Sequence, residues 1–170
     1  GGPPAGAPAA KAAPPAASDA FRRLAWILGV AGLLPFFGHA LFAWVAPPEE
    51  AGGLLRSQAH YAGAVLAFVG ALHWGAALAS PLPFTSRDGV RLAWSVIPAL
   101  FCWVITLYPP SVAVPALFFG LLAAFAADLW LYAGSVVPRW FLALRAVLTA
   151  GAALCVGATW LAMATRLAQG

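Results

Sequence analysis

The sequence predicts an all-α fold: a polytopic transmembrane bundle of five helices, with the N-terminus inside and the C-terminus outside. Of the 170 residues, 63% are hydrophobic and 8% are charged, and the mean hydropathy is +0.88. Such a chain has too little polar surface to cover a water-soluble globule. Its apolar residues fall into five runs, each close to the roughly 20 residues that a helix needs to cross a bilayer core about 30 Å thick.

A Pro/Ala-rich stretch over residues 1–19 precedes the five-helix domain, which we assign to residues 20–170. Proline blocks helix formation, so we expect this stretch to be an extended tail that is held by a partner protein. The chain starts with Gly1 and shows no apolar signal-peptide run near its start. Both features are consistent with a targeting segment already removed or with a truncated chain.

The apolar runs and the Pro, Gly and charged residues between them define the five predicted spans. Ser18 and Asp19 can cap the first span, and Pro35 should kink it. Polar links are expected over residues 47–57 and 80–90. The link at Pro109 and Pro110 is so short that the spans on either side must lie antiparallel. The predicted spans are about 24–45, 58–79, 92–108, 112–132 and 141–163.

Basic residues are unequally distributed between the two predicted sides of the membrane, which predicts the orientation. The side that carries the N-terminus and the second and fourth loops is basic, so it faces the cytoplasm or the mitochondrial matrix. Because the charge marks helix ends rather than one patch, no nucleic-acid partner is predicted. The charged residues of the inner side are Lys11, Arg22, Arg23, Arg87, Arg91, Arg139 and Arg145, and those of the outer side are Arg56, Arg166, Glu49 and Glu50. The interfacial tryptophans are Trp26, Trp94, Trp130 and Trp140 on the inner side and Trp44 and Trp160 on the outer side.

Three polar residues inside the spans, His73, Asp128 and Arg145, form a candidate buried cluster. An isolated charge in hydrocarbon costs at least about 2.5–3.5 kcal/mol, so Asp128 and Arg145 need partners. Both lie ~6 Å deep from the same surface on consecutive spans, which predicts an ion pair, with His73 at ~9 Å as a third member. Two interpretations stay open here: a structural clamp, or a functional site that handles protons or other polar ligands.

Other polar and small residues of the spans favour structural roles. A face of small residues on the second span should direct His73 toward protein rather than lipid. Haem ligation is a minor alternative for the histidines of the first two spans, because His39 and His73 lie at different depths and His60 is close to the surface. The cysteines lack disulfide or zinc spacing and are expected to be core residues. The small residues are Gly63, Ala67, Gly70 and Ala71, the histidines are His39 and His60, and the cysteines are Cys102 and Cys155.

Several stretches combine into a recognisable pattern. They are YAGAVLAFVGALHWGAAL at 61–78, WSVIPALFCW at 94–103, Asp128, and PRWFLALRAVLT at 138–149. Together they resemble a five-span membrane protein family of unknown function, typified by transmembrane protein 69, with members in proteobacterial inner membranes and in mitochondria. The resemblance covers most of residues 24–165 and implies no established activity. It points by position to His73, Trp74, Pro98, Asp128, Trp140 and Arg145.

A small bundle with short loops and an extended tail favours a non-catalytic accessory or assembly subunit of a larger membrane complex. We expect a respiratory-chain complex or supercomplex of the mitochondrial inner membrane, with a bacterial inner membrane as the alternative. Such a subunit acts by helix packing and tail contacts, with other membrane subunits and lipid such as cardiolipin as partners. The competing hypothesis is a small transporter or redox-active protein whose cluster handles protons, anions or quinone. No catalytic residue, metal site or cofactor is predicted.

Overall fold

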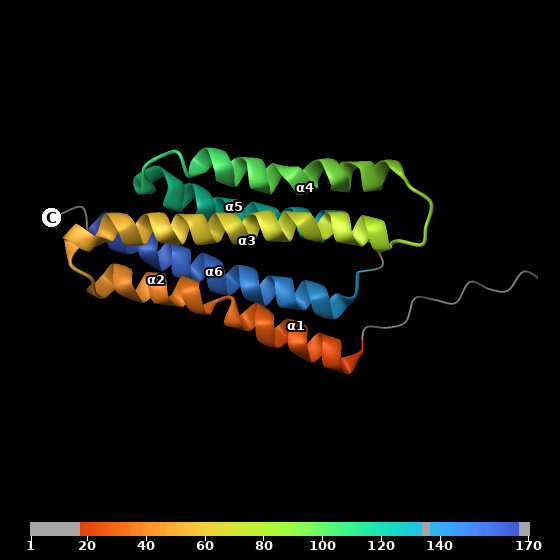
Figure 1. The fold of residues 1–170 in the computed structure, drawn as a ribbon, viewed down its shortest axis with the longest axis horizontal. Helices are drawn as coiled ribbons and strands as arrows, with labels where there is room; N and C mark the ends of the chain where they lie inside the picture. Colours follow the sequence, from red (N-terminus) through yellow and green to blue (C-terminus); the bar gives the residue numbers. More distant parts are fainter. Residues whose placement is uncertain (1–17, 134–136, 167–170) are drawn as a thin grey trace, which may run out of the picture.

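The computed structural model describes residues 18–133 and 137–166, and within them every regular element is a helix. The helices form five antiparallel crossings along one long axis (Figure 1). All five crossings are long and apolar enough to span a membrane, so the predicted five-span, all-α fold is confirmed. The elements are α1 (Asp19–Ala31), α2 (Leu34–Val45), η1 (Pro48–Glu50), α3 (Ala51–Ala79), α4 (Ser86–Ile105), α5 (Pro110–Leu131) and α6 (Arg139–Thr165).

The predicted tail over residues 1–19 lies almost entirely outside the described residues, so its contact with a partner stays a prediction. Its last residue belongs to the first helix instead, and the residue before it caps that helix. Asp19 is the first residue of α1, and Ser18 Oγ accepts a hydrogen bond from the Phe21 backbone N–H at 3.2 Å. An N-cap serine satisfies one of the unpaired N–H groups that begin every helix.

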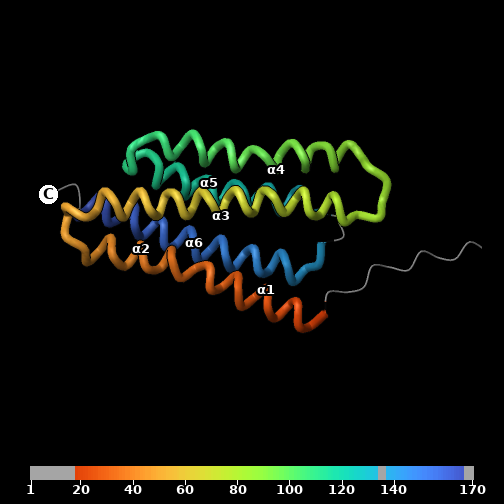
Figure 2. The backbone as a smooth tube through the Cα atoms, viewed as in Figure 1, coloured from red at the N-terminus to blue at the C-terminus, as the bar shows by residue number. Residues whose placement is uncertain are grey.

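The first crossing is broken rather than kinked. α1 ends at Ala31 and α2 begins at Leu34, with Gly32 and Leu33 between them. Pro35 lies in the first turn of α2, where its missing N–H is tolerated, whereas its ring would clash with an uninterrupted preceding turn. The break therefore lies just before the predicted kink site. Because of it α1 diverges from the bundle, as the tube in Figure 2 shows.

The first three crossings start earlier than predicted, the first at Asp19 rather than 24, and the expected links at 47–57 and 80–90 are wrong in extent. α3 begins at Ala51 rather than 58, directly after η1, and α4 spans Ser86–Ile105 rather than 92–108. Local capping explains the early start of α4: Thr85 and Asp88 form a capping box, with Thr85 N–H donating to Asp88 Oδ2 at 2.9 Å. Hydropathy reports where the lipid ends, whereas a helix continues until a cap or a proline ends it.

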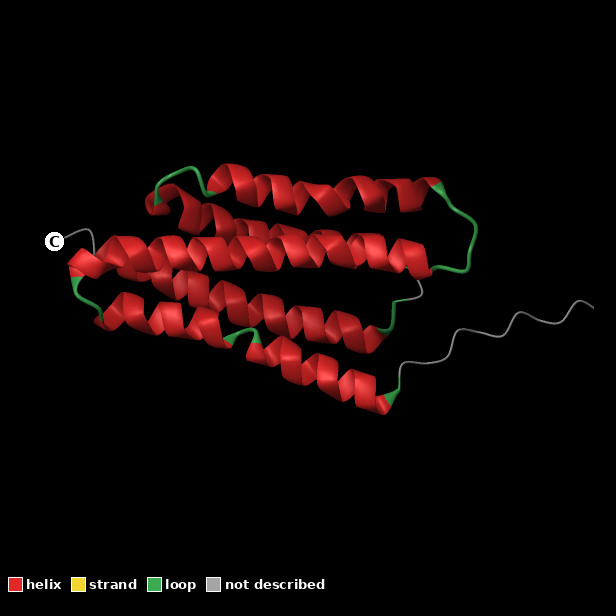
Figure 3. Ribbon diagram, in the orientation of Figure 1, coloured by secondary structure: helices red, strands yellow, loops and turns green. Residues whose placement is uncertain are grey.

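The last two crossings lie within two residues of their predicted ends, at Pro110–Leu131 and Arg139–Thr165. α3 is the central helix and packs against α2, α4 and α5, while α6 packs against α5 and α2. α4 and α5 are in contact, as their short link predicts. Short loops join the helices (Figure 3). The start of α1, the α3–α4 link, the end of α5 and the start of α6 lie at one end of the bundle (Figure 1).

Close packing of α3 on α4 depends on the predicted face of small residues. A Cβ added at Gly70 would lie 2.6 Å from the Ser95 carbonyl oxygen, and one at Gly63 would lie 3.2 Å from Cys102 Cβ. Small residues let membrane helices approach closely enough for van der Waals packing. Ala71 was placed on this face incorrectly, because its side chain is exposed. Cys102 is buried and free, as expected of a core residue.

Candidate functional site

The three polar residues predicted to form a cluster are in direct contact near one end of the bundle. Asp128 of α5 is 1% exposed and His73 of α3 is fully buried. Asp128 Oδ1 accepts a hydrogen bond from His73 Nε2 at 2.8 Å. Asp128 Oδ2 accepts from Arg145 Nε at 2.7 Å and lies 2.6 Å from Arg145 Nη2. The ion pair predicted between α5 and α6 is therefore present, with His73 attached to its other carboxylate oxygen.

A threonine and aromatic rings surround this cluster. Arg145 Nη1 donates to Thr149 Oγ1 at 3.3 Å, one turn further along α6. The Tyr132 ring, one turn after Asp128, stacks on the His73 ring with centroids 4.3 Å apart and planes inclined by 7°. The arginine also lies over the Phe125 ring, at 6.0 Å from its centroid. These neighbours keep water from the ion pair and fix the orientation of its side chains.

Sequence analysis missed Thr149 and Tyr132, although helical spacing could have identified both. Each lies four residues after a charged member of the cluster, and side chains four apart share a helix face. Hydropathy does not distinguish them from other membrane residues. Their role becomes visible only when the positions of Arg145 and His73, the side chains that they contact, are known. The site therefore consists of His73, Asp128, Arg145, Thr149 and Tyr132, drawn from α3, α5 and α6.

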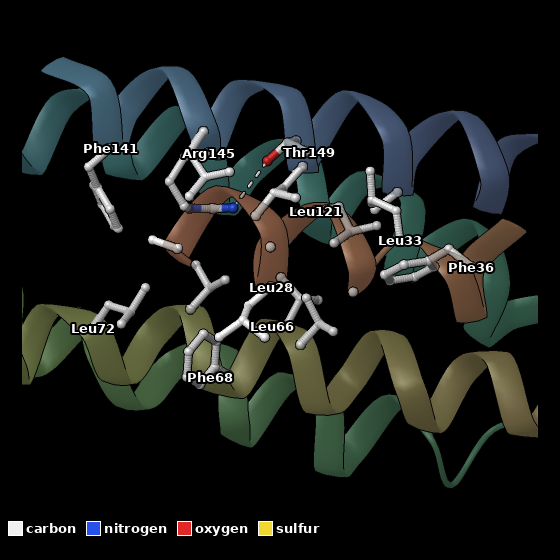
Figure 4. A pocket seen from close by; sticks show the side chains of 18 of the residues that line it. Leu28, Leu33, Phe36, Leu66, Phe68, Leu72, Leu121, Phe141, Arg145 and Thr149 are labelled. Atoms are coloured by element: carbon white, nitrogen blue, oxygen red, sulfur yellow. Dashed lines mark hydrogen bonds between the residues drawn. The ribbon is translucent and has the colours of Figure 1, made fainter. Parts of the chain in front are cut away.

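A cavity of about 700 Å³ lies beside the cluster, between α1, α3 and α6. Its wall is almost entirely apolar, with side chains such as Leu28, Phe68 and Phe141 pointing into it (Figure 4). Arg145 and Thr149 reach the same wall and are joined there by their hydrogen bond (Figure 4). The arginine of the ion pair thus borders a space that is large enough for a small ligand, since ligand pockets are typically about 300–1,000 Å³.

The remaining family-like positions lie near the cluster but do not contact it. Trp74 follows His73 and is 48% exposed, as expected for a side chain facing lipid. Pro98 is buried against Gly70, which places it in the α3–α4 contact. Trp140 lies in the first turn of α6, lines the cavity and packs edge-on against Phe21 of α1, with ring centroids 6.1 Å apart.

The geometry of His39 does not support haem ligation. Its Nδ1 lies 2.6 Å from the Pro35 carbonyl oxygen, and its Nε2 lies 2.9 Å from Ser57 Oγ. Both ring nitrogens are therefore engaged, Nδ1 within α2 and Nε2 in a contact between α2 and α3. His60 is exposed. Within the described residues, no group of three or more His, Cys, Asp or Glu side chains could hold a metal ion.

Several arginines whose positions predict the membrane orientation also donate hydrogen bonds to backbone carbonyl oxygens at helix ends. At the end of α5, Arg91 Nε donates to the Leu131 carbonyl at 2.9 Å, and Arg87 Nη2 donates to the Trp130 carbonyl at 2.5 Å. Arg166 donates to carbonyl oxygens at the end of α2, including that of Ala46 at 2.7 Å. The last carbonyls of a helix lack intrahelical partners and carry partial negative charge, so cations stabilise them.

Comparison with known proteins identifies the family. The family described as protein of unknown function (DUF3429) matches residues 21–161. Transmembrane protein 69 of Xenopus tropicalis is 35% identical over 127 residues, which cover 72% of this chain and 47% of that protein. Transmembrane protein 69 of Mus musculus is 34% identical over 122 residues, which cover 71% of this chain and 48% of that protein.

The chain spans about half the length of the curated relatives it matches. No solved structure matches it significantly. The described fold, with five helices long and apolar enough to cross a membrane, agrees with the word transmembrane in the names of both relatives. The chain therefore belongs to the DUF3429 family, a membrane protein family of unknown function.

Proposed function

We propose that the chain is a non-catalytic accessory or assembly subunit of a larger membrane complex, one of the respiratory chain in the mitochondrial inner membrane. A bacterial inner membrane is the alternative location. The subunit acts through helix packing against neighbouring subunits, with its basic, N-terminal end on the matrix or cytoplasmic side and the Pro/Ala tail in contact with a partner.

The packing of α1 is the observation that carries this proposal. None of the residues of α1, all of which are described, is buried, and the helix packs mainly on α6. Helices in lipid associate through van der Waals packing, so a crossing that is poorly packed in its own chain has a surface available for another. An apolar stripe marks this surface and continues from α1 onto α2, and we call it the α1 stripe. It consists of Ile27 and Val30 of α1 and Leu34, Phe37 and Leu41 of α2, each at least 45% exposed.

The charged cluster supports the same function as a rigid clamp. It joins α3, α5 and α6 at the end of the bundle where α1 diverges. Paired charges fix the register of neighbouring helices, because any slip leaves a charge without its partner. A clamp of this kind holds the bundle constant while the α1 stripe packs against a neighbouring subunit.

Native electrophoresis of the tagged protein, extracted from its own membrane in mild detergent, tests the proposal. We expect it to migrate with a large complex whose subunits are identified by mass spectrometry. Val30→Trp, on the α1 part of the stripe, should release the chain from that complex. Leu154→Trp, on the 74% exposed side chain of α6, is the matched control and should not. Migration of the unmodified chain as a free monomer contradicts the proposal.

A second function is favoured by the position of the cluster beside the cavity. Ionisable residues buried inside a membrane protein mark substrate, ion or proton pathways, and Arg145, which is joined through Asp128 to His73, borders a ligand-sized space here. Such a group suits the handling of protons, anions or quinones. Asp128→Asn in proteoliposomes tests it through proton or anion flux, with Asp19→Asn as the control. Undiminished flux in the Asp128 variant eliminates this second function, and it leaves the subunit proposal intact.

A further inference from the structure

The cavity between α1, α3 and α6 opens sideways toward lipid rather than toward water. α2 packs on α3, whereas α1 diverges and packs mainly on α6. Leu28 of α1 and Phe68 of α3 both line the cavity, yet they are 62% and 66% exposed. Because these exposed side chains lie within helices long and apolar enough to cross a membrane, this side of the cavity is expected to face the hydrocarbon.

The polar part of the cavity wall selects the chemistry of that molecule. An arginine has five N–H donors, and three are accounted for by Asp128 and Thr149. The two others can serve an acceptor in the cavity. The charge of Arg145 is already balanced by Asp128, so an anion placed there would lose its hydration and face the nearby carboxylate. A neutral acceptor such as a carbonyl oxygen escapes this cost.

The depth of the polar wall distinguishes between lipid classes. Arg145 lies six residues, or ~9 Å of helix, further into the membrane than Arg139 at the start of α6. A phospholipid keeps its charged phosphate at the surface, at about the depth of Arg139, and places only acyl chains against Arg145. The spare donors would then have no acceptor, which is costly in hydrocarbon. A lipid with a small neutral head can carry that head to Arg145.

We propose that this cavity binds a prenyl or alkyl quinone, a long-chain lipid whose neutral ring bears carbonyl oxygens. One carbonyl accepts hydrogen bonds from Arg145 and Thr149, the ring lies against Phe141, and the tail leaves between Leu28 and Phe68 into the bilayer. The assignment deepens the second function proposed above and rests on it for its biological use. Binding itself is measured without flux, so the two can fail separately.

The experiment uses the full chain in nanodiscs of neutral phosphatidylcholine, with a decyl-substituted 1,4-benzoquinone as the probe. Trp140 and Tyr61 line the cavity, so a bound quinone should quench the intrinsic fluorescence saturably. Thr149→Val removes one polar contact and should weaken binding about 3- to 10-fold, the equivalent of one net hydrogen bond. Thr159→Val is the control, because that buried threonine lies on the same helix and donates to the Cys155 carbonyl instead.

A pair of neighbouring substitutions on α1 tests the route of entry without altering the polar wall. Leu28→Trp fills the cavity opening and should abolish saturable quenching. Ile27→Trp should leave it unchanged, because Ile27 is equally exposed, at 64%, but does not line the cavity. Equal affinity in the Thr149 and Thr159 variants, or equal effects of the two tryptophans, overturns the proposal. So does complete competition by phosphatidylglycerol, which would make the cavity an acyl-chain site.

Discussion

Replacing Asp128 by asparagine should destabilise the bundle more than any surface charge removal. The carboxylate is 1% exposed and has contacts with His73 Nε2 at 2.8 Å, Arg145 Nε at 2.7 Å and Arg145 Nη2 at 2.6 Å. Two unit charges about 4 Å apart attract by about 4 kcal/mol at an effective dielectric constant near 20. Removing one partner of a buried pair typically costs about 3–5 kcal/mol, because the other charge stays buried and unpaired. We therefore expect a loss of about 3–4 kcal/mol in the free energy of unfolding.

The assay is reversible unfolding in mixed micelles with an increasing fraction of sodium dodecyl sulfate, followed by circular dichroism and tryptophan fluorescence. Asp19→Asn is the matched control, because Asp19 pairs with Arg22 at 3.0 Å while its side chain is 76% exposed. Its free energy of unfolding should hardly change, since exposed pairs contribute little.

A double-mutant cycle separates the ion pair from general disruption. Arg145→Leu alone leaves Asp128 uncompensated, whereas Asp128→Leu with Arg145→Leu removes both charges. The double variant should therefore lose less stability than the sum of the two single variants, by about 1–3 kcal/mol of coupling. Strict additivity, or a loss below about 1 kcal/mol for Asp128→Asn, the range of an exposed pair, would refute the clamp.

Three further predictions concern packing, capping and orientation. Gly70→Ala should cost about 1–3 kcal/mol in the same unfolding assay, because the new Cβ would lie 2.6 Å from a backbone carbonyl oxygen of α4. Gly75→Ala is the control and should be neutral or stabilising, because a Cβ at Gly75 would have no neighbouring atom within 4 Å. Thr85→Ala should cost about 1 kcal/mol and lower helicity at the start of α4, because the capping box is lost. In a chain whose native cysteines are replaced, Ser80→Cys should be labelled from the matrix or cytoplasmic side and Pro47→Cys from the opposite side by impermeant maleimide. The reverse pattern contradicts the predicted orientation.

Hydropathy and the positions of the buried charges in the sequence were sufficient to predict the five crossings and the ion pair. The membrane class and the five crossings follow from hydropathy, because lipid requires long apolar helices whatever their neighbours are. The pairing of Asp128 with Arg145 follows from the cost of an unpaired charge in hydrocarbon, combined with equal depth on consecutive helices. Both arguments need only the sequence, because they compare a side chain with the hydrocarbon around it and count residues from the ends of the apolar runs.

The tertiary structure decided what depends on partners distant in the chain. Thr149 and Tyr132 join the cluster because α3, α5 and α6 place them against Arg145 and His73. Helical spacing puts each on the face of a charged residue, but it does not show which side chain each one contacts. The observed helix ends differ from the predicted ones where a capping contact, such as that of Thr85, rather than hydropathy determines the first residue of the helix. The cavity exists because α1 leaves the bundle at the break before Pro35. A sequence can indicate that break, but the space it opens depends on the positions of the other helices.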